Sequence, residues 1–554
     1  MEQSRREVRA TFVASRLPLR TIAAGTVGSV LMMLAALGAG GILISDPVIG
    51  AGPLSWIRYG HGRWLATWVL YAGFGLTVLA WIRLGRYVLR GKADATAVLV
   101  AAACWMAPLL ISPPLFTRDA FVYLAQGALL YDLDPYTNAP NMVEGLPTVV
   151  QNVYTAWQST PSPYGPLFLA IAKGVVTLTG DDPILGVIVL RLALLPGLLA
   201  LVWVLTKLAP HLGGRAAIAL WLAVASPMMV VHLWGGPHNE LIMLAFLAGG
   251  VLAALQRKHL LAVFLGTLAM LIKPTGALVL PFIVWIWANH LPAERGRVRN
   301  FVTAFVPAVG LFAVVYAAGT WLSLGSINFG WLGALDGPQL IKNWLNFPTG
   351  IGQLLHFVAD LFVDVPQSPF VTGARGVAWL VLACFATWQW WQARNGGVTA
   401  VKHLAITLLA VAMLAPPTLP WYFSWALVVA AGFTWTPRAM AVVVGGSVFL
   451  VLAFYPTGEQ ALYNWWYMAM VFVAMYLAAR AMVQPEPLAL RELLARGWQE
   501  IRPRRAAPSA TAEAGEQPRR SRTPDSSRPS RSAGTPAAPY PYTCPKKDSA
   551  ASSA

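Results

Sequence analysis

The chain has 554 residues, of which 57% are hydrophobic and 11% are charged, and its mean hydropathy is +0.58. These values lie outside the range of soluble domains and indicate a polytopic membrane protein. A net charge of +17 would suggest nucleic acid in a soluble protein, but in a membrane protein its distribution reports topology, and we expect no nucleic-acid partner. The three cysteines are too few for a disulfide framework or a metal cluster, and no Gly-rich phosphate loop, HExxH or CxxC motif occurs.

Apolar windows recur along the chain, each about 20 residues long, which is the length needed to cross about 30 Å of hydrocarbon. They predict an all-α bundle of about 14 transmembrane helices, because helices satisfy their own backbone hydrogen bonds in lipid. The first window resembles a signal peptide at its start but is long enough to be an uncleaved span. The short segments within 260–290 are also compatible with paired half-spans. The predicted spans are 21–45, 64–82, 94–112, 183–206, 216–234, 241–255, 260–272, 276–290, 300–320, 376–393, 403–416, 421–436, 439–455 and 463–482.

The distribution of basic residues predicts the orientation of these spans. If the N-terminus is cytoplasmic, only 8 of the 40 Lys and Arg residues fall in the outer loops and spans, as the positive-inside rule requires. Residues 1–20 then form a basic cytoplasmic N-terminus, and 21–482 form the transmembrane region with large outer loops at 113–182 and 321–375. Residues 483–554 form a basic cytoplasmic tail rich in Pro, Ser and Ala, which lacks the apolar surface needed to fold and is predicted to be mostly disordered.

The first outer loop is predicted to carry helices on the membrane surface. A helix that starts near Thr117 places Asp119, Tyr123 and Gln126 on one face and apolar side chains on the other. A second apolar segment, "PYGPLFLAIAKGVVTLTG", is interrupted by Lys173 and fits an interfacial or re-entrant helix better than a span. The turn-rich "DLDPYTNAPN" joins them, so the loop is predicted to be a platform of surface helices.

Five candidate residues lie at two outer boundaries of the predicted bundle. Arg118 and Asp119 follow an apolar run as an expected ion pair, although an acid in the first helical turn is also favoured by the helix dipole. "LWGGPHNELIM" places His238 and Glu240 where the chain turns back at the surface, together with Asn239, whose alternative role is to cap the next helix. Ionisable residues at membrane depth are costly, which makes these residues candidates for function.

A lysine and an aromatic cluster complete the set of candidates. In "LIKPTGALVLPF", Lys273 lies in an apolar stretch where Pro274 interrupts the helix, and the alternative interpretation is a lysine that snorkels to the surface. "PPTLPWYFSW" places Trp421, Tyr422 and Trp425 at another outer boundary, where we expect an ordinary aromatic belt. An acid, a histidine and a lysine on the outer side of a helical bundle suit group transfer from a lipid phosphate.

These motifs resemble those of the actinobacterial polyprenol-phosphomannose-dependent α-1,6-mannosyltransferases, members of the GT-C class of glycosyltransferases. The resemblance rests on "RDAFVYLAQGALLYDLDPYTNAP", "SPYGPLFLA", "GGPHNE", "IKPTGALVLPF", "PWYFSWAL" and "SWIRYGHGRWLA", which occur in order between about residue 20 and about residue 480. Ala120 and Phe121 stand where Val and Tyr are expected, which weakens a role for position 121.

The resemblance implies a GT-C-like fold and transfer of mannose to a lipid-anchored mannan, the backbone of lipomannan and lipoarabinomannan, on the outer face of the plasma membrane. The donor would be polyprenyl-phosphate-mannose, a co-substrate, with no metal or other cofactor. Inversion in a single displacement needs a base for the acceptor hydroxyl, assigned to Asp119 held by Arg118, and positive charge at the departing phosphate. Further residues are assigned to substrate: Lys273 and His238 to the phosphate, and Asn239, Glu240, Asp134, Tyr136 and Tyr164 to sugar or acceptor.

Two other classes remain alternatives. A lipid or sugar transporter would show inverted repeats and charges near the midplane, whereas here no repeat is evident and the charges gather at the outer boundary. Another lipid-carrier-dependent glycosyltransferase or ligase would favour a large late loop rich in Arg and His, whereas 321–375 contains few such residues. The sequence leaves open whether the enzyme starts or extends the mannan.

Overall fold

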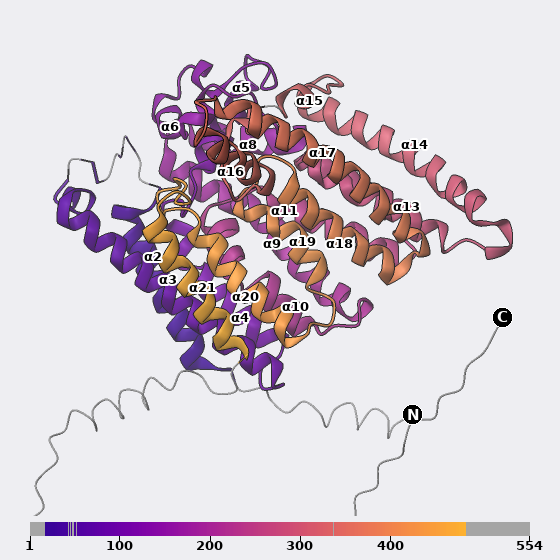
Figure 1. Cartoon of the computed structure of the whole chain (residues 1–554), viewed down its shortest axis with the longest axis horizontal. Helices are drawn as coiled ribbons and strands as arrows, with labels where there is room; N and C mark the ends of the chain where they lie inside the picture. The colour runs from indigo at the N-terminus through magenta and orange to yellow at the C-terminus, as the bar shows by residue number, and fades with distance from the viewer. Residues whose placement is uncertain are drawn as a thin grey trace, which may run out of the picture. The chain divides into compact units, whose positions relative to one another are not determined.

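The computed structural model describes residues 17–483, except 42, 43, 45, 47, 48, 51 and 336 (Figure 1). In this part of the chain every regular element is helical, apart from one isolated bridge between Phe454 and Gln460. The all-α class expected from the sequence is therefore confirmed. Residues 1–16 and almost the whole predicted tail, from 484 onward, lie outside the described residues.

Long apolar helices dominate the bundle. Seven of the described helices are long and apolar enough to cross a membrane, and a bent pair would make an eighth. Their side chains are apolar on most faces, so only their ends need polar surroundings, as expected of a membrane protein. The seven helices are α2 (Leu19–Ala39), α3 (Gly60–Leu89), α9 (Pro183–His211), α14 (Arg297–Leu324), α17 (Gln367–Gln392), α18 (Gly397–Leu414) and α21 (Trp465–Val483).

Two predicted spans are interrupted in the structure. The predicted span 216–234 divides into α10 (Ala216–Ala223) and the π-helical η4 (Met228–Gly235), which meet at 53°, because Pro227 between them cannot continue a regular helix. The predicted span 421–436 contains the end of η9 (Pro420–Tyr422) and α19 (Phe423–Ala430), whose eight residues reach about 12 Å at 1.5 Å per residue. The span at 216–234 is therefore a bent pair of helices in the structure, and the span at 421–436 stays a prediction that no single long helix supports.

Shorter apolar helices fill the rest of the bundle: α4 (Ala95–Met106), α11 (Glu240–Leu255), α12 (His259–Ile272), α13 (Leu280–Ala288) and α20 (Pro437–Leu452). Each of these helices has fewer than 18 residues and is therefore too short to cross the membrane on its own. A total of about 14 spans therefore stays a prediction. The break between α12 and α13, occupied by the short helix η5 (Pro274–Val279), places Lys273 at a helix end.

Helices of the two large loops gather at one end of the bundle, at the top of Figure 1. From the first loop come α5 (Asp119–Leu129), α6 (Pro147–Asn152), α7 (Thr155–Gln158) and α8 (Pro166–Thr179), and from the second come α15 (Trp331–Ala334) and α16 (Phe347–Asp360). All residues of α5 are buried, because α6, α8 and α9 pack around it. The helix predicted to start near Thr117 is present, but the face that carries Asp119, Tyr123 and Gln126 is turned into the protein, so α5 does not lie on a surface.

One buried arginine and one glycine join the start of α5 to the end of η4. Arg191 on α9 is fully buried and donates hydrogen bonds to the carbonyl groups of Leu110, Ser112, Trp234 and Gly235 at 2.5 to 3.2 Å. At Gly236 an added Cβ would lie 2.4 Å from Thr117 Cγ2, so only glycine permits this approach. The chain entering α5 and the chain entering α11 are thereby held against each other.

Candidate active site

Asp119 stands at the first position of α5 and lines a pocket there, close to the start of α11. Its backbone N–H donates to Thr117 Oγ1 at 3.1 Å, and its carboxylate lies 3.8 Å from His238 Nδ1. The residue is only 7% exposed. Two candidates that are 119 positions apart in the sequence are thus neighbours in the structure.

His238 connects Asp119 to a buried ion pair. Its Nδ1 lies 3.1 Å from the hydroxyl of Tyr123 and 4.0 Å from Glu240 Oε2. Glu240 in turn forms an ion pair with Lys273, at the break between α12 and η5. The four predicted ionisable residues of α5, α11 and the α12 break therefore form one continuous cluster.

Aromatic rings surround the ammonium group of Lys273. Its Nζ lies 4.5 Å from the ring centre of Tyr422, 5.6 Å from Trp425 and 5.7 Å from Tyr164. Such faces stabilise a cation, which keeps the charge in place together with Glu240. Trp425 is buried, so the predicted aromatic belt in this segment is wrong: these rings form an inner wall.

The position of Tyr164 depends on a close approach to α12. The N–H of Gly165 donates to the carbonyl of Ile272 at 3.0 Å, and a Cβ at this position would lie 2.1 Å from the Leu271 oxygen. Tyr136, also buried, donates its hydroxyl proton to the Tyr164 carbonyl at 3.1 Å. The predicted Tyr164 therefore lines the site, and the predicted Tyr136 supports it from behind.

Two cavities meet at Asp119. The larger has a volume of about 530 Å³ and is mostly apolar, with Lys273, Tyr164 and Gln126 among its polar lining groups. The smaller has a volume of about 260 Å³ and a more polar wall. The two share four lining residues, Asp119, Trp157, Leu419 and Trp421. A carboxylate at this junction faces molecules that enter from either side.

Burial controls the protonation of the two central groups. Removal from water raises the pKa of Asp119 to about 7, against the opposing effect of the positive charge of Lys273. Burial also lowers the pKa of His238 well below its usual range, and the nearby His232 and Lys273 act in the same direction. The site therefore contains a carboxyl group that titrates near neutral pH beside a neutral imidazole.

Arg118 does not perform the predicted contact with Asp119. No ion pair joins these two described side chains; Arg118 lines the smaller cavity, and its Nε is buried without a hydrogen-bond partner. The reason is helix geometry, since consecutive residues at a helix start project in directions about 100° apart. The expected orienting ion pair is wrong, and the neighbours of Asp119 are Thr117 and His238 instead.

The residues of "GGPHNE" lie one layer behind the cavity walls. His238, Asn239 and Glu240 are fully buried and line neither cavity, and His238 stacks on Trp421 with ring centres 4.1 Å apart. Asn239 occupies the N-cap position of α11 without a capping side-chain bond, and its amide group has no hydrogen-bond partner among the described residues. These residues contact the wall of the site rather than its open space.

Asp134 lies apart from this cluster. It is exposed, and its carboxylate accepts a hydrogen bond from the backbone N–H of Tyr136 at 2.9 Å. This is the geometry of a turn-stabilising aspartate. The structure thus places the predicted Asp134 in a turn, outside both cavities.

The smaller cavity contains residues that the sequence did not single out. Tyr154, Trp157, Lys342 and Gln460 line it, and they come from three distant segments. Arg375 fixes the segment that carries Lys342, because it donates to the carbonyl groups of Gln339 and Ile341 at 2.8 and 2.7 Å. No local motif marks these residues, since the two large loops and the segment between α20 and α21 come together only in the folded protein.

Within the described part of the chain, no group of three or more His, Cys, Asp or Glu side chains has an arrangement suited to a metal ion. The absence of a metal or further cofactor from the reaction stays a prediction.

Comparison with known proteins gives consistent matches over most of the chain. Residues 22–289 match the family described as "Alpha-(1->6)-mannopyranosyltransferase, N-terminal domain", and 348–484 match the "MptB C-terminal domain". Alpha-(1->6)-mannopyranosyltransferase A of Mycobacterium tuberculosis is 37% identical over 444 residues, covering 80% of this chain and 85% of that protein. The enzyme of the same name from Corynebacterium glutamicum is 32% identical over 456 residues, covering 78% and 92%.

Alpha-(1->6)-mannopyranosyltransferase B of Corynebacterium glutamicum is 29% identical over 451 residues, covering 75% of this chain and 72% of that protein. No solved structure matches the chain. The family models cover the first large loop, the cluster around Asp119 and the second large loop from residue 348 onward, and the helices are those of a membrane protein. The chain therefore belongs to the alpha-(1->6)-mannopyranosyltransferase family and is a membrane glycosyltransferase that transfers mannose.

Proposed function

We propose that this enzyme transfers mannose from polyprenyl-phosphate-mannose to an α-1,6-linked mannan chain of a lipoglycan, on the outer face of the plasma membrane. The observation that carries the proposal is the position of Asp119, which among the described residues is the acid shared by a larger, mostly apolar cavity and a smaller, more polar one. A lipid-linked donor suits the first cavity and a carbohydrate acceptor suits the second. The names of the relatives support the mannosyl group and the α-(1→6) linkage.

The donor is assigned to the larger cavity because of its charge and its wall. Lys273 is the basic residue that lines it, and its ammonium is held by Glu240 and the surrounding rings, ready for an anionic phosphate. Gln126 lines the same space with a buried Oε1 that has no hydrogen-bond partner among the described residues. That oxygen is suited to accept a hydrogen bond from a hydroxyl group of the mannose.

The acceptor is assigned to the smaller cavity. Its lining contributes the guanidinium of Arg118, the ammonium of Lys342 and the side chain of Gln460, all of which donate hydrogen bonds to hydroxyl oxygens. Trp157 adds an aromatic wall at the junction with the donor cavity. A sugar chain in this cavity presents its terminal hydroxyl towards Asp119.

The reaction proceeds as one displacement. As the acceptor hydroxyl oxygen bonds to C1 of mannose, the bond from C1 to the phosphate oxygen breaks, and polyprenyl phosphate leaves with the electron pair. Asp119 takes the hydroxyl proton, and its pKa of about 7 suits a general base at neutral pH. Lys273 stabilises the negative charge that grows on the departing phosphate. A β-linked donor then gives an α-linked product.

His238 acts in this scheme as a positioning residue. Its neutral ring lies between Asp119 and Trp421, and so fixes both walls at the junction of the cavities. Glu240 fixes Lys273, and Tyr164 contributes one ring of its surroundings. Asn239 lies beside these groups and lines neither cavity, so it takes a supporting position.

The outer-face orientation is supported by the opposite ends of α14. The helix begins with Arg297 and Arg299, near Arg295, whereas its other end leads into the loop that covers the cavities. Basic residues are retained on the cytoplasmic side, so the cavities belong to the outer side.

In a cysteine-free background, a cysteine at Asp132 should react with an impermeant maleimide in intact cells. A cysteine at Glu294 should react only after permeabilisation, and the reverse pattern would contradict this orientation.

The proposal is tested by mannose transfer in membranes from a host without its own α-1,6-mannosyltransferases. Polyprenyl-phosphate-mannose and a short α-1,6-mannoside are supplied to the wild type and to Asp119→Asn at matched protein level. Asp132→Asn, an exposed acid just after α5, serves as the control. We expect transfer by the wild type and the control and its loss in Asp119→Asn.

Equal transfer by the wild type and Asp119→Asn would show that a residue other than Asp119 acts as the general base. No transfer by a folded wild type would contradict the proposal and favour another lipid-carrier-dependent glycosyltransferase, a ligase or a lipid or sugar transporter.

A further inference from the structure

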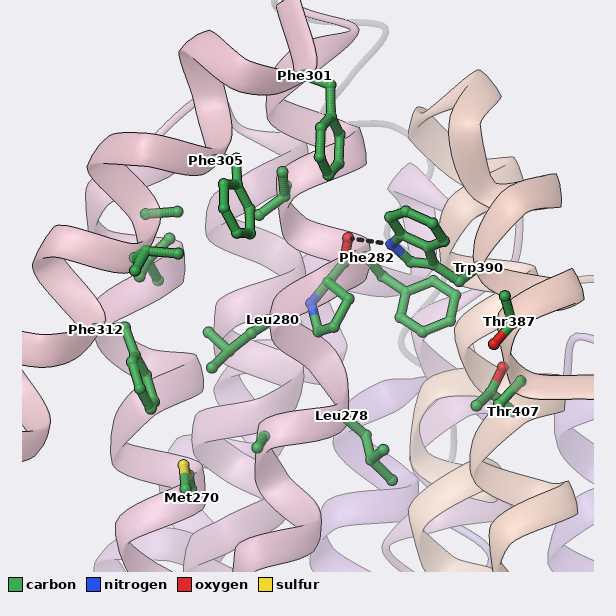
Figure 2. A pocket seen from close by; sticks show the side chains of 17 residues that line it. Met270, Leu278, Leu280, Phe282, Phe301, Phe305, Phe312, Thr387, Trp390 and Thr407 are labelled. Carbon is green, nitrogen blue, oxygen red and sulfur yellow. Dashed lines mark hydrogen bonds between the residues drawn. The ribbon is translucent and has the colours of Figure 1, made fainter. Parts of the chain in front are cut away.

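A second apolar cavity, of about 660 Å³, lies beside the donor cavity (Figure 2). Its walls come from α12, the η5 to α13 segment, α14, α17 and α18. Figure 2 shows Phe305 and Phe312 of α14 on one side of it and Thr387 and Trp390 of α17 on the other. Among the described residues that line it, none carries a charge. The cavity is therefore suited to hydrocarbon and not to a sugar or a phosphate.

This cavity adjoins the donor cavity. Met270, Ala277, Leu278 and Ala386 line both of them. Ala277 and Ala386, two of these four residues, have only a methyl group as side chain. A molecule whose polar end lies at Lys273 therefore has the apolar cavity next to it, across a wall that is thinnest at these small side chains.

The apolar cavity also borders the side of the bundle that faces lipid. The most apolar windows of α14 and α17 are only 17% and 22% buried, so these helices present most of their surface outside the protein. Figure 1 shows α14 at the margin of the bundle with α17 beside it. Along α14 the lining extends from Phe301 to Phe312, which corresponds to about 16 Å at 1.5 Å per residue. The path therefore covers about half of the roughly 30 Å of hydrocarbon.

We propose that the cavity between α14 and α17 binds the isoprenoid chain of the lipid-linked donor, directing it from Lys273 past Ala386 towards the basic end of α14. The inference rests on the function proposed above and adds the route of the lipid chain and a basis for selecting long chains. Units of the chain close to the phosphate pass the junction, and later units contact Phe312 and Phe305. Only a donor long enough to pass the junction gains this contact.

The test narrows the junction. Ala386→Trp places a large ring where the two cavities meet, on a helix that is mostly exposed to lipid. Cys384→Trp is the matched control, because Cys384 is exposed on the same helix, two positions away, and lines neither cavity. Kinetics are measured with decaprenyl-phosphate-mannose and with geranyl-phosphate-mannose, whose chain has two isoprene units and serves as the short-chain donor.

We expect Ala386→Trp to raise the KM for the decaprenyl donor by about tenfold, equivalent to the lost burial of about two methylene groups. Its KM for the geranyl donor and both values of Cys384→Trp should stay within about twofold of the wild type. An equal change for both donors, or no change for either, would overturn the proposed route. Transfer from neither donor by the wild type would instead contradict the proposed function.

A binding measurement keeps the two proposals separate. Thr387→Cys, in a background where Cys104, Cys384 and Cys544 are serine, places a single thiol in the apolar cavity. Its reaction with an apolar maleimide is followed in detergent, without any turnover. We expect decaprenyl phosphate to slow labelling at least about fivefold and geranyl phosphate to leave it unchanged, as burial of the longer chain predicts. Equal protection by a phospholipid, or no protection by decaprenyl phosphate, would overturn the inference.

Discussion

The protonation of Asp119 gives the sharpest expected consequence of the structure. Only the ionised carboxylate accepts the acceptor proton, so the rate follows its ionised fraction. With a pKa of about 7 in place of 3.8, this fraction rises from about one tenth at pH 6 to about nine tenths at pH 8. We therefore expect kcat/KM of the wild type to increase about tenfold between these two values and then to level off. An aspartate at its ordinary pKa would give a flat profile over this range.

The assay is mannose transfer in nanodiscs between pH 5.5 and 8.5, with the wild type, Asp119→Asn, Lys273→Met and Asp132→Asn. Asp119→Asn should lower the rate about 10²- to 10⁴-fold, the usual contribution of a general base. Its remaining activity should no longer show the acidic limb, which is the rise in kcat/KM between pH 6 and pH 8. Lys273 lowers the pKa of Asp119, so its removal should move the limb of the residual activity to higher pH. Asp132→Asn, in an exposed position, should keep the wild-type profile.

A wild-type profile that is flat between pH 6 and pH 8 would refute the argument from burial. An acidic limb that survives in Asp119→Asn would show that another group titrates. A limb that moves to lower pH in Lys273→Met would contradict the sign of the interaction between the two charges.

Three further substitutions test how the site is held. Gly236→Ala brings a Cβ to 2.4 Å from Thr117 and should lower stability by about 1 to 3 kcal/mol, measured as the thermal midpoint in detergent; an unchanged midpoint would contradict the tight contact. Glu240→Gln leaves the charge of Lys273 without its ion-pair partner and should cost about 3 kcal/mol, whereas a stability equal to the wild type would show that the rings suffice. Arg191→Gln leaves several buried carbonyl groups without a hydrogen bond and should lower stability by about 1 to 3 kcal/mol for each of them. A thermal midpoint equal to that of the wild type would contradict the role of Arg191 in holding the start of α5 against the end of η4.

The composition of the chain was sufficient to predict an all-α membrane protein, because hydropathy is a property of each segment by itself. Asp119, His238, Glu240 and Lys273 could also be singled out, since ionisable side chains in an apolar chain are costly and rarely accidental. The structure brings these four together through contacts at 4.0 Å or less. Their catalytic and binding roles remain proposals, but their proximity is a feature of the fold.

The side chains that these residues contact could not be predicted from the sequence. Neighbouring positions suggested a pair of Arg118 with Asp119, but side-chain direction at the start of α5 separates them and places His238 beside Asp119 instead. Lys342 enters the site only because the second large loop folds over the first. A local pattern determines which segments are apolar and which residues are unusual. The meeting of two cavities at one carboxylate depends on contacts between residues hundreds of positions apart, and therefore on tertiary packing alone.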